Sequence, residues 1–239
     1  MNEAGRSVIS LLSETVLPFP CPLCDEEISD SGLNLLCPEC QQKLRPFSDP
    51  TCPGCGGTLD GVLEFCSLCM REEPRLWVGA FALFPLTGSA RQLIHRFKYR
   101  DTPQMARSVG LLGAQRLEAR GIKPDVIVPT PLHWTRQLQR GFNQSEQFSR
   151  MLAHYSGIPS ESLLRRVKRT HQQAKLNREQ RKKNLSGAFS VKKGAKLKKR
   201  DILLVDDVMT TGATLHSAAA ALAAAGAGRI FIMVIARRM

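Results

Sequence analysis

The hydrophobic and polar positions of the chain predict alternating strands and helices from about residue 76 onward. Residues 76–86 alternate loosely between apolar and polar side chains and carry aromatic residues, which is typical of one or two strands. Residues 125–129 and 202–205 are short apolar runs of the kind that forms strands buried on both faces. Strands of this kind that alternate with helices indicate a parallel α/β sheet.

Four helices are predicted around these strands. In residues 88–99 the apolar side chains of Leu93, Ile94 and Phe97 share one face, and basic residues surround them. The other three helices are expected over residues 103–120, 143–155 and 215–225. Because such sheets bind ligands beyond the carboxyl ends of their strands, residues 129–140 and 206–214 are expected to converge on one site.

The segment of residues 202–214 is the most informative part of the chain. It reads Ile-Leu-Leu-Val-Asp-Asp-Val-Met-Thr-Thr-Gly-Ala-Thr and leads into an alanine-rich helix. A strand followed by a small-residue turn and a helix N-terminus forms an anion site, and the turn's hydroxyls add hydrogen-bond donors. The two carboxylates would repel an anion, so they are expected to hold sugar hydroxyls or Mg²⁺. Together these features predict a sugar-phosphate ligand.

Two other interpretations of this segment compete with that prediction. It could be an ordinary strand–helix turn with surface aspartates, and that alternative stays open. A response-regulator receiver domain also begins with a strand that ends in paired aspartates. A receiver needs about a hundred residues after the pair, and 32 residues follow Asp207, so its length excludes it.

All 13 positions of the segment resemble the binding motif of the type I phosphoribosyltransferases. The resemblance implies a parallel sheet flanked by helices, and it implies that Asp206 and Asp207 hold the ribose hydroxyls of phosphoribosyl pyrophosphate (PRPP). It implies that Mg²⁺ enters with the sugar phosphate. The turn would then hold the 5′-phosphate through Thr210, Thr211, Gly212, Ala213 and Thr214. Purine-salvage members carry an acidic residue where this chain has Thr210, so a general base of that type is missing.

The positive charge of the chain is concentrated in one segment. The net charge is +13, and residues 165–200 hold 15 Lys or Arg against a single acid, Glu179. A local basic segment suggests contact with a polyanion. It resembles the loop that type I enzymes close over pyrophosphate, for which Gln173, Arg178 and Arg181 are candidates; Arg140, beside Gly141, is a further candidate. The competing interpretation is a salt-sensitive nucleic-acid contact.

The eight cysteines form four C-x-x-C pairs, and none lies after residue 69. Two such pairs can supply the four thiolates of a tetrahedral zinc site, so the sequence predicts two structural zinc ions. Which pairs share a zinc is left open by the spacing. The eight ligands are Cys21, Cys24, Cys37, Cys40, Cys52, Cys55, Cys66 and Cys69. A zinc-ribbon module over residues 1–75 and a phosphoribosyltransferase-like domain over residues 76–239 are expected.

The compartment is expected to be the cytoplasm. The chain has no run of 18 apolar residues, so it is not expected to be an integral membrane protein. The apolar stretch over residues 8–17 is short and interrupted by Ser and Glu, which does not fit a signal peptide. Reduced cysteines that bind metal suit this compartment better than disulfides do.

Three further segments resemble the ComF/GntX branch of the phosphoribosyltransferases. They are Leu-Ile-His-Arg-Phe-Lys at 93–98, Pro-Thr-Pro-Leu-His-Trp-Thr-Arg-Gln-Leu-Gln-Arg-Gly-Phe-Asn-Gln-Ser at 129–145, and His-Gln-Gln-Ala-Lys-Leu-Asn-Arg-Glu-Gln-Arg-Lys-Lys-Asn-Leu-Ser-Gly-Ala-Phe at 171–189. The resemblance implies a role in DNA uptake or utilisation, with single-stranded DNA and other competence proteins as candidate partners. One hypothesis is a PRPP-binding protein that acts as a phosphoribosyltransferase. The alternative is a non-catalytic, zinc-containing adaptor that binds single-stranded DNA or a partner protein.

Overall fold

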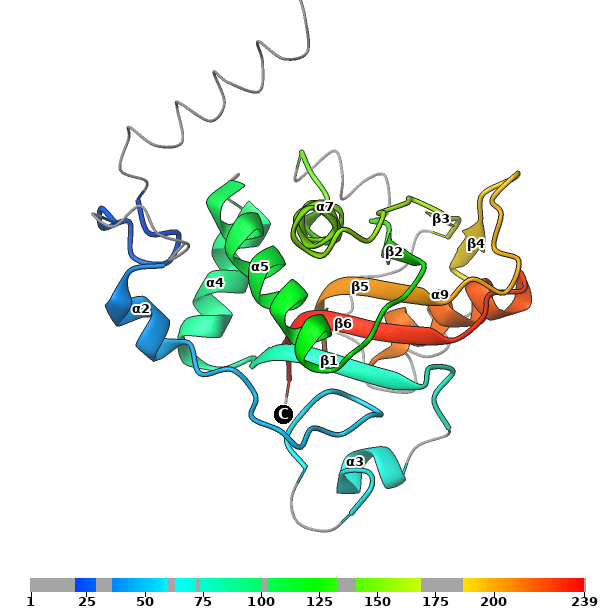
Figure 1. Ribbon diagram of the computed structural model, residues 1–239, viewed down its shortest axis with the longest axis horizontal. Helices are drawn as coiled ribbons and strands as arrows, with labels where there is room; N and C mark the ends of the chain where they lie inside the picture. The colour runs from blue at the N-terminus through cyan, green and yellow to red at the C-terminus, as the bar shows by residue number, and fades with distance from the viewer. Residues whose placement is uncertain are drawn as a thin grey trace, which may run out of the picture.

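A four-stranded parallel sheet forms the centre of the molecule (Figure 1). The computed structural model describes residues 20–28, 36–59, 63–71, 74–99, 103–132, 141–168 and 187–238. The strand order is β1-β6-β5-β2, and every neighbouring pair is parallel. The bounds of these strands are Gly79–Pro85 for β1, Val126–Pro129 for β2, Ile202–Met209 for β5 and Ile230–Arg237 for β6. The expected parallel α/β fold is therefore confirmed.

The helices of the sheet domain agree with the predicted helices to within two residues at each end. They are α4 (Gly88–Tyr99), α5 (Pro103–Ala119), α7 (Gln144–Ser156) and α9 (Ala213–Ala224). Two short strands, β3 (Leu164–Arg166) and β4 (Phe189–Val191), form a separate antiparallel pair. Two short helices, α2 (Pro38–Lys43) and α3 (Ser67–Met70), lie in the cysteine-rich part of the chain.

Two features of the sheet differ from the expectation. The apolar run predicted a strand over residues 202–205, but β5 continues to Met209, because its backbone still pairs with β6 beyond Val205. Strand β6 is absent from the strands predicted above, although its apolar run fits a buried strand. It lies between β1 and β5, so it joins the first strand of the domain to the strand that carries the acidic pair.

The sheet has two buried cores, because successive side chains of a strand point to opposite faces. Helices α4, α5 and α7 cover one face, where Leu203 and Met233 are buried. Helix α9 and the β3–β4 pair cover the other face, where Leu204 and Ile232 are buried. This is the layered arrangement that a parallel sheet requires.

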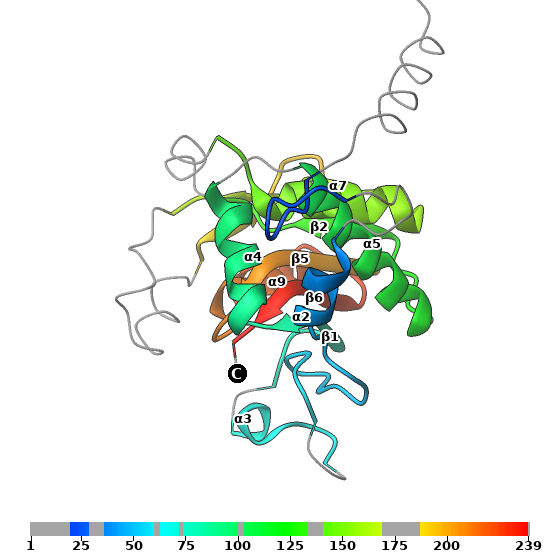
Figure 2. The ribbon, with the colours of Figure 1, turned by 90° about the vertical axis from the view of Figure 1, so that its left-hand side faces the viewer.

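The cysteines gather into two clusters that lie on opposite faces of this sheet: Cys21, Cys24, Cys37 and Cys40 form the first, and Cys52, Cys55, Cys66 and Cys69 form the second. Cys21 and Cys40 share a buried core with α4 and α5, whereas Cys52 and Cys55 share the other core with α9. Accordingly, α2 lies on the side of α4, while α3 lies below β1 (Figures 1 and 2). The domain boundary near residue 75 stays a prediction, since both clusters share buried side chains with the sheet.

The edge strand β1 is covered by the segment that joins the two clusters. The Phe47 N–H donates to the Leu83 carbonyl at 3.1 Å, and the Phe47 carbonyl in turn accepts a bond from Arg116 on α5. An unpaired strand edge invites pairing with other chains, so this cover protects β1. Across the described residues, no helix has the length and apolar character needed to cross a bilayer.

Candidate ligand and metal sites

The carboxyl end of β2 lies beside β5 just before the acidic pair; residues 133–140 of the predicted 129–140 loop lie outside the described residues. Pro129 is the register partner of Val205, the residue that precedes the acidic pair. Immediately beyond, the Thr130 N–H donates to the Val205 carbonyl at 2.9 Å, and its hydroxyl donates to the same oxygen at 3.0 Å. The loop after β2 is therefore hydrogen-bonded to β5 at the residue that precedes Asp206.

Asp206 is partly buried and accepts hydrogen bonds from two directions. The Ser145 hydroxyl donates to its Oδ1 at 2.9 Å, and the Asp207 N–H donates to the same atom at 2.9 Å. Burial and the neighbouring Asp207 charge raise the pKa of Asp206 to about 6, although the hydrogen bonds from Ser145 and the Asp207 N–H oppose that rise. A carboxyl of this kind is deprotonated above pH 6 and can accept hydroxyl donors from a ligand.

Ser145 is placed by the way α7 begins. The Asn143 side chain accepts the Ser145 N–H at 3.2 Å, which is the usual N-cap bond of a helix. The Asn143 side-chain amide also donates to the Thr130 carbonyl at 3.1 Å. The start of α7 is thus bound to the loop after β2, with Ser145 directed at Asp206.

Asp207 forms an ion pair with a residue from a distant helix. The Nζ atom of Lys98, near the end of α4, lies 2.9 Å from Asp207 Oδ2. The two side chains are 24% and 17% exposed, so water screens the pair less than it screens a surface pair. The Gln144 side chain donates to the Lys98 carbonyl at 3.4 Å, which joins α4 to α7 at the same place.

The turn between β5 and α9 has the conformation that the small residues allow. Gly212 adopts φ 76° and precedes the first residue of α9. A Cβ atom at this position would lie 2.8 Å from Met209 Cε and 3.4 Å from Arg75 Nη1. The positive φ favours glycine at this position, while the two neighbouring atoms are the ends of flexible side chains that can move aside. The N-terminus of a 12-residue helix follows directly, and its N–H groups favour an anion.

A buried guanidinium supports this turn from behind. Arg237, at the end of β6, is 6% exposed, and its Nη1 atom donates to the Thr210 carbonyl at 2.9 Å. On the other side of the turn, the Ala213 N–H is 3.4 Å from the Thr211 hydroxyl. The turn is therefore held by interactions at both of its ends.

The structure brings together part of the predicted site. Asp206, Asp207 and residues 210–214 form one continuous segment at the end of β5. The remaining candidates lie outside the described residues: Arg140, Gln173, Arg178 and Arg181. The described parts of the basic segment are residues 165–168 and 187–200. They contain all of β4 and all of β3 except Leu164.

Sequence reasoning missed several residues that surround the acids. They are Lys98, Thr130, Ser145 and Arg237. Lys98 and Ser145 lie within segments that were singled out for their resemblance, and Thr130 lies in the predicted 129–140 loop without being named; the Asn143 cap signal could have located Ser145. Arg237 lies near the chain end, where a basic residue resembles an ordinary solvated one.

The cysteines form two compact clusters, each made of two neighbouring C-x-x-C pairs. Within each cluster the sulfur atoms lie within 4.8 Å of one another. The Cys24 and Cys37 sulfurs are 3.6 Å apart, and those of Cys55 and Cys66 are 3.7 Å apart. Tetrahedral zinc with bonds of about 2.3 Å spaces its sulfurs by roughly 3.8 Å, so both clusters fit a structural zinc ion.

The chemistry of the second cluster also suits a metal, because zinc binds thiolates. A hydrogen bond from Cys69 and the nearby positive charge of Arg237 lower the pKa of Cys55 to about 4 against the opposing effect of burial. The same interaction raises the pKa of Cys69. Cys55 is therefore a thiolate at neutral pH, whereas the pKa values of Cys66 and Cys69 are raised.

The sheet, the acidic strand end and the glycine turn define a phosphoribosyltransferase-type domain that follows two Cys₄ zinc sites. Two family models match accordingly: the phosphoribosyl transferase domain over residues 96–239 and the double zinc ribbon domain over residues 12–70. The chain therefore belongs to the phosphoribosyltransferase-domain family, and within it to the ComF group that its relatives define.

Three of these relatives match most of the chain. Competence protein F of Haemophilus influenzae is 32% identical over 85% of this chain and 91% of its own length. DNA utilization protein YhgH of Escherichia coli K12 is 30% identical over 93% and 99%, respectively. Competence protein ComFC of Bacillus subtilis is 28% identical over 91% of each chain.

Two solved structures also resemble this one. Glutamine PRPP amidotransferase from B. subtilis is 17% identical, with a TM-score of 0.41 over 59% of this chain and 30% of that protein. Adenine phosphoribosyltransferase from Leishmania donovani is 15% identical, with a TM-score of 0.40 over 66% of this chain and 83% of that protein.

Proposed function

We propose that the chain binds PRPP at residues 206–214 and serves DNA uptake or utilisation, acting as a phosphoribosyltransferase. The observation that carries the proposal is the pairing of a hydrogen-bonded carboxylate, Asp206, with a glycine turn at the start of α9. A carboxylate accepts sugar hydroxyls, and a helix N-terminus stabilises a phosphate. The carboxylate and the turn follow one another at the end of a single strand, so they can contact the sugar hydroxyls and the phosphate of one ribose 5-phosphate.

Each part of the site has a separate task in this proposal. Asp206 and Asp207 accept the ribose hydroxyls, and Ser145 holds Asp206 in place. The N–H groups and hydroxyls of residues 210–214 hold the 5′-phosphate. Lys98, which pairs with Asp207, neutralises negative charge beside the sugar. Arg140, Gln173, Arg178 and Arg181 are proposed to contact the pyrophosphate.

Mg²⁺ is proposed to enter with the ligand. The oxygen atoms of Asp206 and Asp207 are of the type that Mg²⁺ prefers, and the PRPP phosphates supply the rest of a hard-oxygen ligand set. When bound, the ion neutralises the charge of the pyrophosphate leaving group. The protein's own residues would orient the sugar.

Thermal unfolding tests the binding proposal. We expect PRPP with Mg²⁺ to raise the melting temperature of the parent protein, because a ligand that binds the folded state stabilises it. Asp206→Ala combined with Asp207→Ala is expected to abolish the rise. Glu146→Ala, which removes a partly exposed acid near the start of α7, is the matched control and should keep it. Absence of a rise in the parent protein would contradict the proposal.

The biological part of the proposal rests on the relatives named Competence protein F, ComFC and DNA utilization protein. A complementation test addresses it directly. In H. influenzae lacking Competence protein F, this chain is expected to restore competence, and the double Asp→Ala variant is expected not to. Equal restoration by both proteins would show that DNA uptake does not depend on the PRPP site.

A second candidate function is a non-catalytic contact with single-stranded DNA or a partner protein. The described end of the basic segment supports it, because the lysines between β4 and β5 are exposed: Lys192, Lys193, Lys196, Lys198 and Lys199. A phosphate contact of this kind loses affinity as salt rises. Salt-sensitive binding of a single-stranded oligonucleotide that survives the double Asp→Ala change, together with no response to PRPP, would favour this candidate.

A further inference from the structure

The ammonium group of Lys98 lies beside the acidic pair near the end of β5. Its Nζ atom is 2.9 Å from Asp207 Oδ2, and the lysine side chain is 24% exposed. Helix α4, which carries Lys98, stands beside the ends of β5 and β6 (Figure 2). The ammonium is therefore accessible to a ligand that the two aspartates hold.

The backbone that carries this ammonium is fixed, whereas the side chain can move. Phe97, the preceding residue, is fully buried in the core that α4 shares with α5. The Gln144 side chain donates to the Lys98 carbonyl at 3.4 Å, which joins this end of α4 to the start of α7. A lysine side chain is a flexible stem that ends in three N–H donors, so its ammonium can bond to Asp207 and to a ligand at the same time.

The acidic pair needs a nearby positive charge if it is to hold PRPP. In that ligand the pyrophosphate is attached to C1, next to a carbon that bears a ribose hydroxyl. Its negative charges therefore lie close to the carboxylates that accept the hydroxyls, and like charges at such distances repel one another. Ribose 5-phosphate lacks the pyrophosphate and carries its phosphate at the other end of the sugar. Lys98 is the basic side chain that the structure pairs with the aspartates.

We propose that Lys98 recognises the pyrophosphate on C1 and so determines the preference of the site for PRPP over ribose 5-phosphate. The inference rests on the proposed function, because it takes Asp206 and Asp207 as the ribose-binding pair. One N–H of the ammonium stays with Asp207, and another donates to a pyrophosphate oxygen in a charge-assisted hydrogen bond. Asp207 then has two tasks, because it accepts a ribose hydroxyl and also holds Lys98 at the C1 end of the sugar.

The dissociation constants of PRPP and ribose 5-phosphate, measured by calorimetry at one fixed Mg²⁺ concentration, test this assignment. Lys98→Met is expected to lower the affinity for PRPP about tenfold or more, since a hydrogen bond between charged groups is lost. The affinity for ribose 5-phosphate is expected to change less than about threefold, because that ligand has no charged group at C1. Equal losses for the two ligands would show that Lys98 supports the site without reading the pyrophosphate, and would overturn the proposal.

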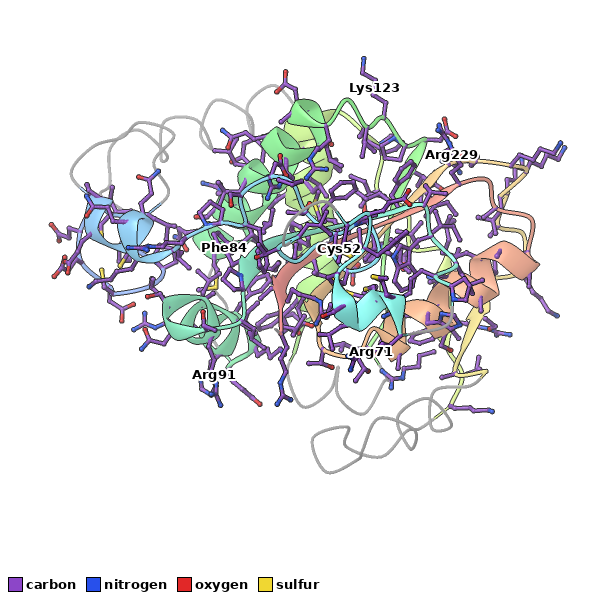
Figure 3. All side chains as sticks on the ribbon, turned by 90° about the horizontal axis from the view of Figure 1, so that it is seen from below. Cys52, Arg71, Phe84, Arg91, Lys123 and Arg229 are labelled. Carbon is purple, nitrogen blue, oxygen red and sulfur yellow. The ribbon has the colours of Figure 1, made fainter. Side chains whose placement is uncertain are left out.

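Three further variants complete the comparison. Lys123→Met is the matched control, because Lys123 is exposed and extends outward at the edge of the molecule (Figure 3), and it should leave both dissociation constants unchanged. Lys98→Arg keeps the positive charge and is expected to retain most of the preference for PRPP. Lys98→Gln removes the charge but keeps a polar chain, and it replaces Lys98→Met if that variant does not fold. An undiminished preference for PRPP in either neutral variant would overturn the proposal.

The parent protein separates a failure of this inference from a failure of the proposed function. A parent protein that binds PRPP and ribose 5-phosphate equally well contradicts this inference alone. A parent protein that binds neither ligand contradicts the proposed function as well.

Discussion

The hydroxyl of Ser145 donates a hydrogen bond of 2.9 Å to the carboxylate of Asp206, joining residues 61 positions apart in the sequence. The bond ties the start of α7 to the end of β5 at the place where ribose is proposed to bind. Because the donor favours the charged form of the acid, Ser145 acts on both the position and the protonation of Asp206.

Replacing this donor tests its role. Ser145→Ala is expected to raise the pKa of Asp206 further and to weaken PRPP binding at neutral pH by about tenfold, since a hydrogen bond to a charged group contributes about 1.5 to 3 kcal/mol. Titration calorimetry measures the change. Ser156→Ala is the matched control, because that hydroxyl bonds to the Leu152 carbonyl at the far end of α7. Equal losses in both variants would show a general effect on α7.

The pH dependence of PRPP binding follows from the raised pKa of Asp206. The folded value of about 6 lies above the ordinary 3.8, so the protein takes up a proton at Asp206 as the pH falls through about 6. A protonated carboxyl accepts ribose hydroxyls less well, so affinity is expected to fall below pH 6 by up to about tenfold per unit.

The ligand's own phosphates also titrate, so a control is needed. Asp206→Asn keeps the shape of the side chain and removes its proton equilibrium. Its affinity is expected to be lower and to depend less steeply on pH than that of the parent protein. Dissociation constants measured at pH values above and below 6 provide the comparison, and parallel pH profiles would exclude Asp206 as the titrating group.

The metal content is expected to be two zinc ions per chain. Cys24→Ser and Cys55→Ser should each retain about one zinc, because each variant damages one tetrahedral set. Elemental analysis of the purified proteins checks this. A single zinc in the parent protein, or pairing of the thiols as disulfides, would contradict the assignment.

Chelation is expected to destabilise the whole protein and not the cysteine-rich part alone. The two clusters share buried cores with opposite faces of the sheet, so loss of either metal disturbs the packing of the domain. Hydrogen exchange after chelator treatment should therefore increase in β1 and α4 as well as around the cysteines. Exchange confined to residues before 75 would instead support an independent zinc module.

Gly56→Ala tests how the second cluster is seated. Gly56 combines φ 71° with a Cβ position 2.5 Å from the Ala82 nitrogen, so the change is expected to cost about 3 kcal/mol or more in the free energy of unfolding. Gly194→Ala is the matched control: its φ is 80°, but a Cβ there would meet no atom within 4 Å, so about 1 kcal/mol is expected. Chemical denaturation measures both, and equal costs would show that the close contact is unimportant.

The sequence predicted the elements whose signals are local. Apolar periodicity located α4, and the Asp206–Asp207 pair followed by Gly212 marked the strand end and turn. The spacing of the cysteines predicted two Cys₄ sets but not which C-x-x-C pairs form each set. That pairing depends on how the chain folds around β1, which no local spacing encodes.

The contacts that the sequence did not reveal come from distant elements. Lys98 reaches Asp207 from α4, and Arg237 reaches Thr210 from β6. Both are ordinary basic residues in the sequence, and only the packing of the helix and the strand order bring them to the turn. The strand order in particular places β6 beside β5, so the chain end becomes part of the site.

Calorimetric titration of the zinc-loaded protein with PRPP and Mg²⁺ is the sharpest test of a PRPP site at residues 206–214. We expect saturable binding of one PRPP per chain, lost in the Asp206→Asn, Asp207→Asn double variant while its melting temperature without ligand stays close to that of the parent protein. Binding that is unaffected by the double change, or no binding by the parent protein, would show that the site does not hold PRPP.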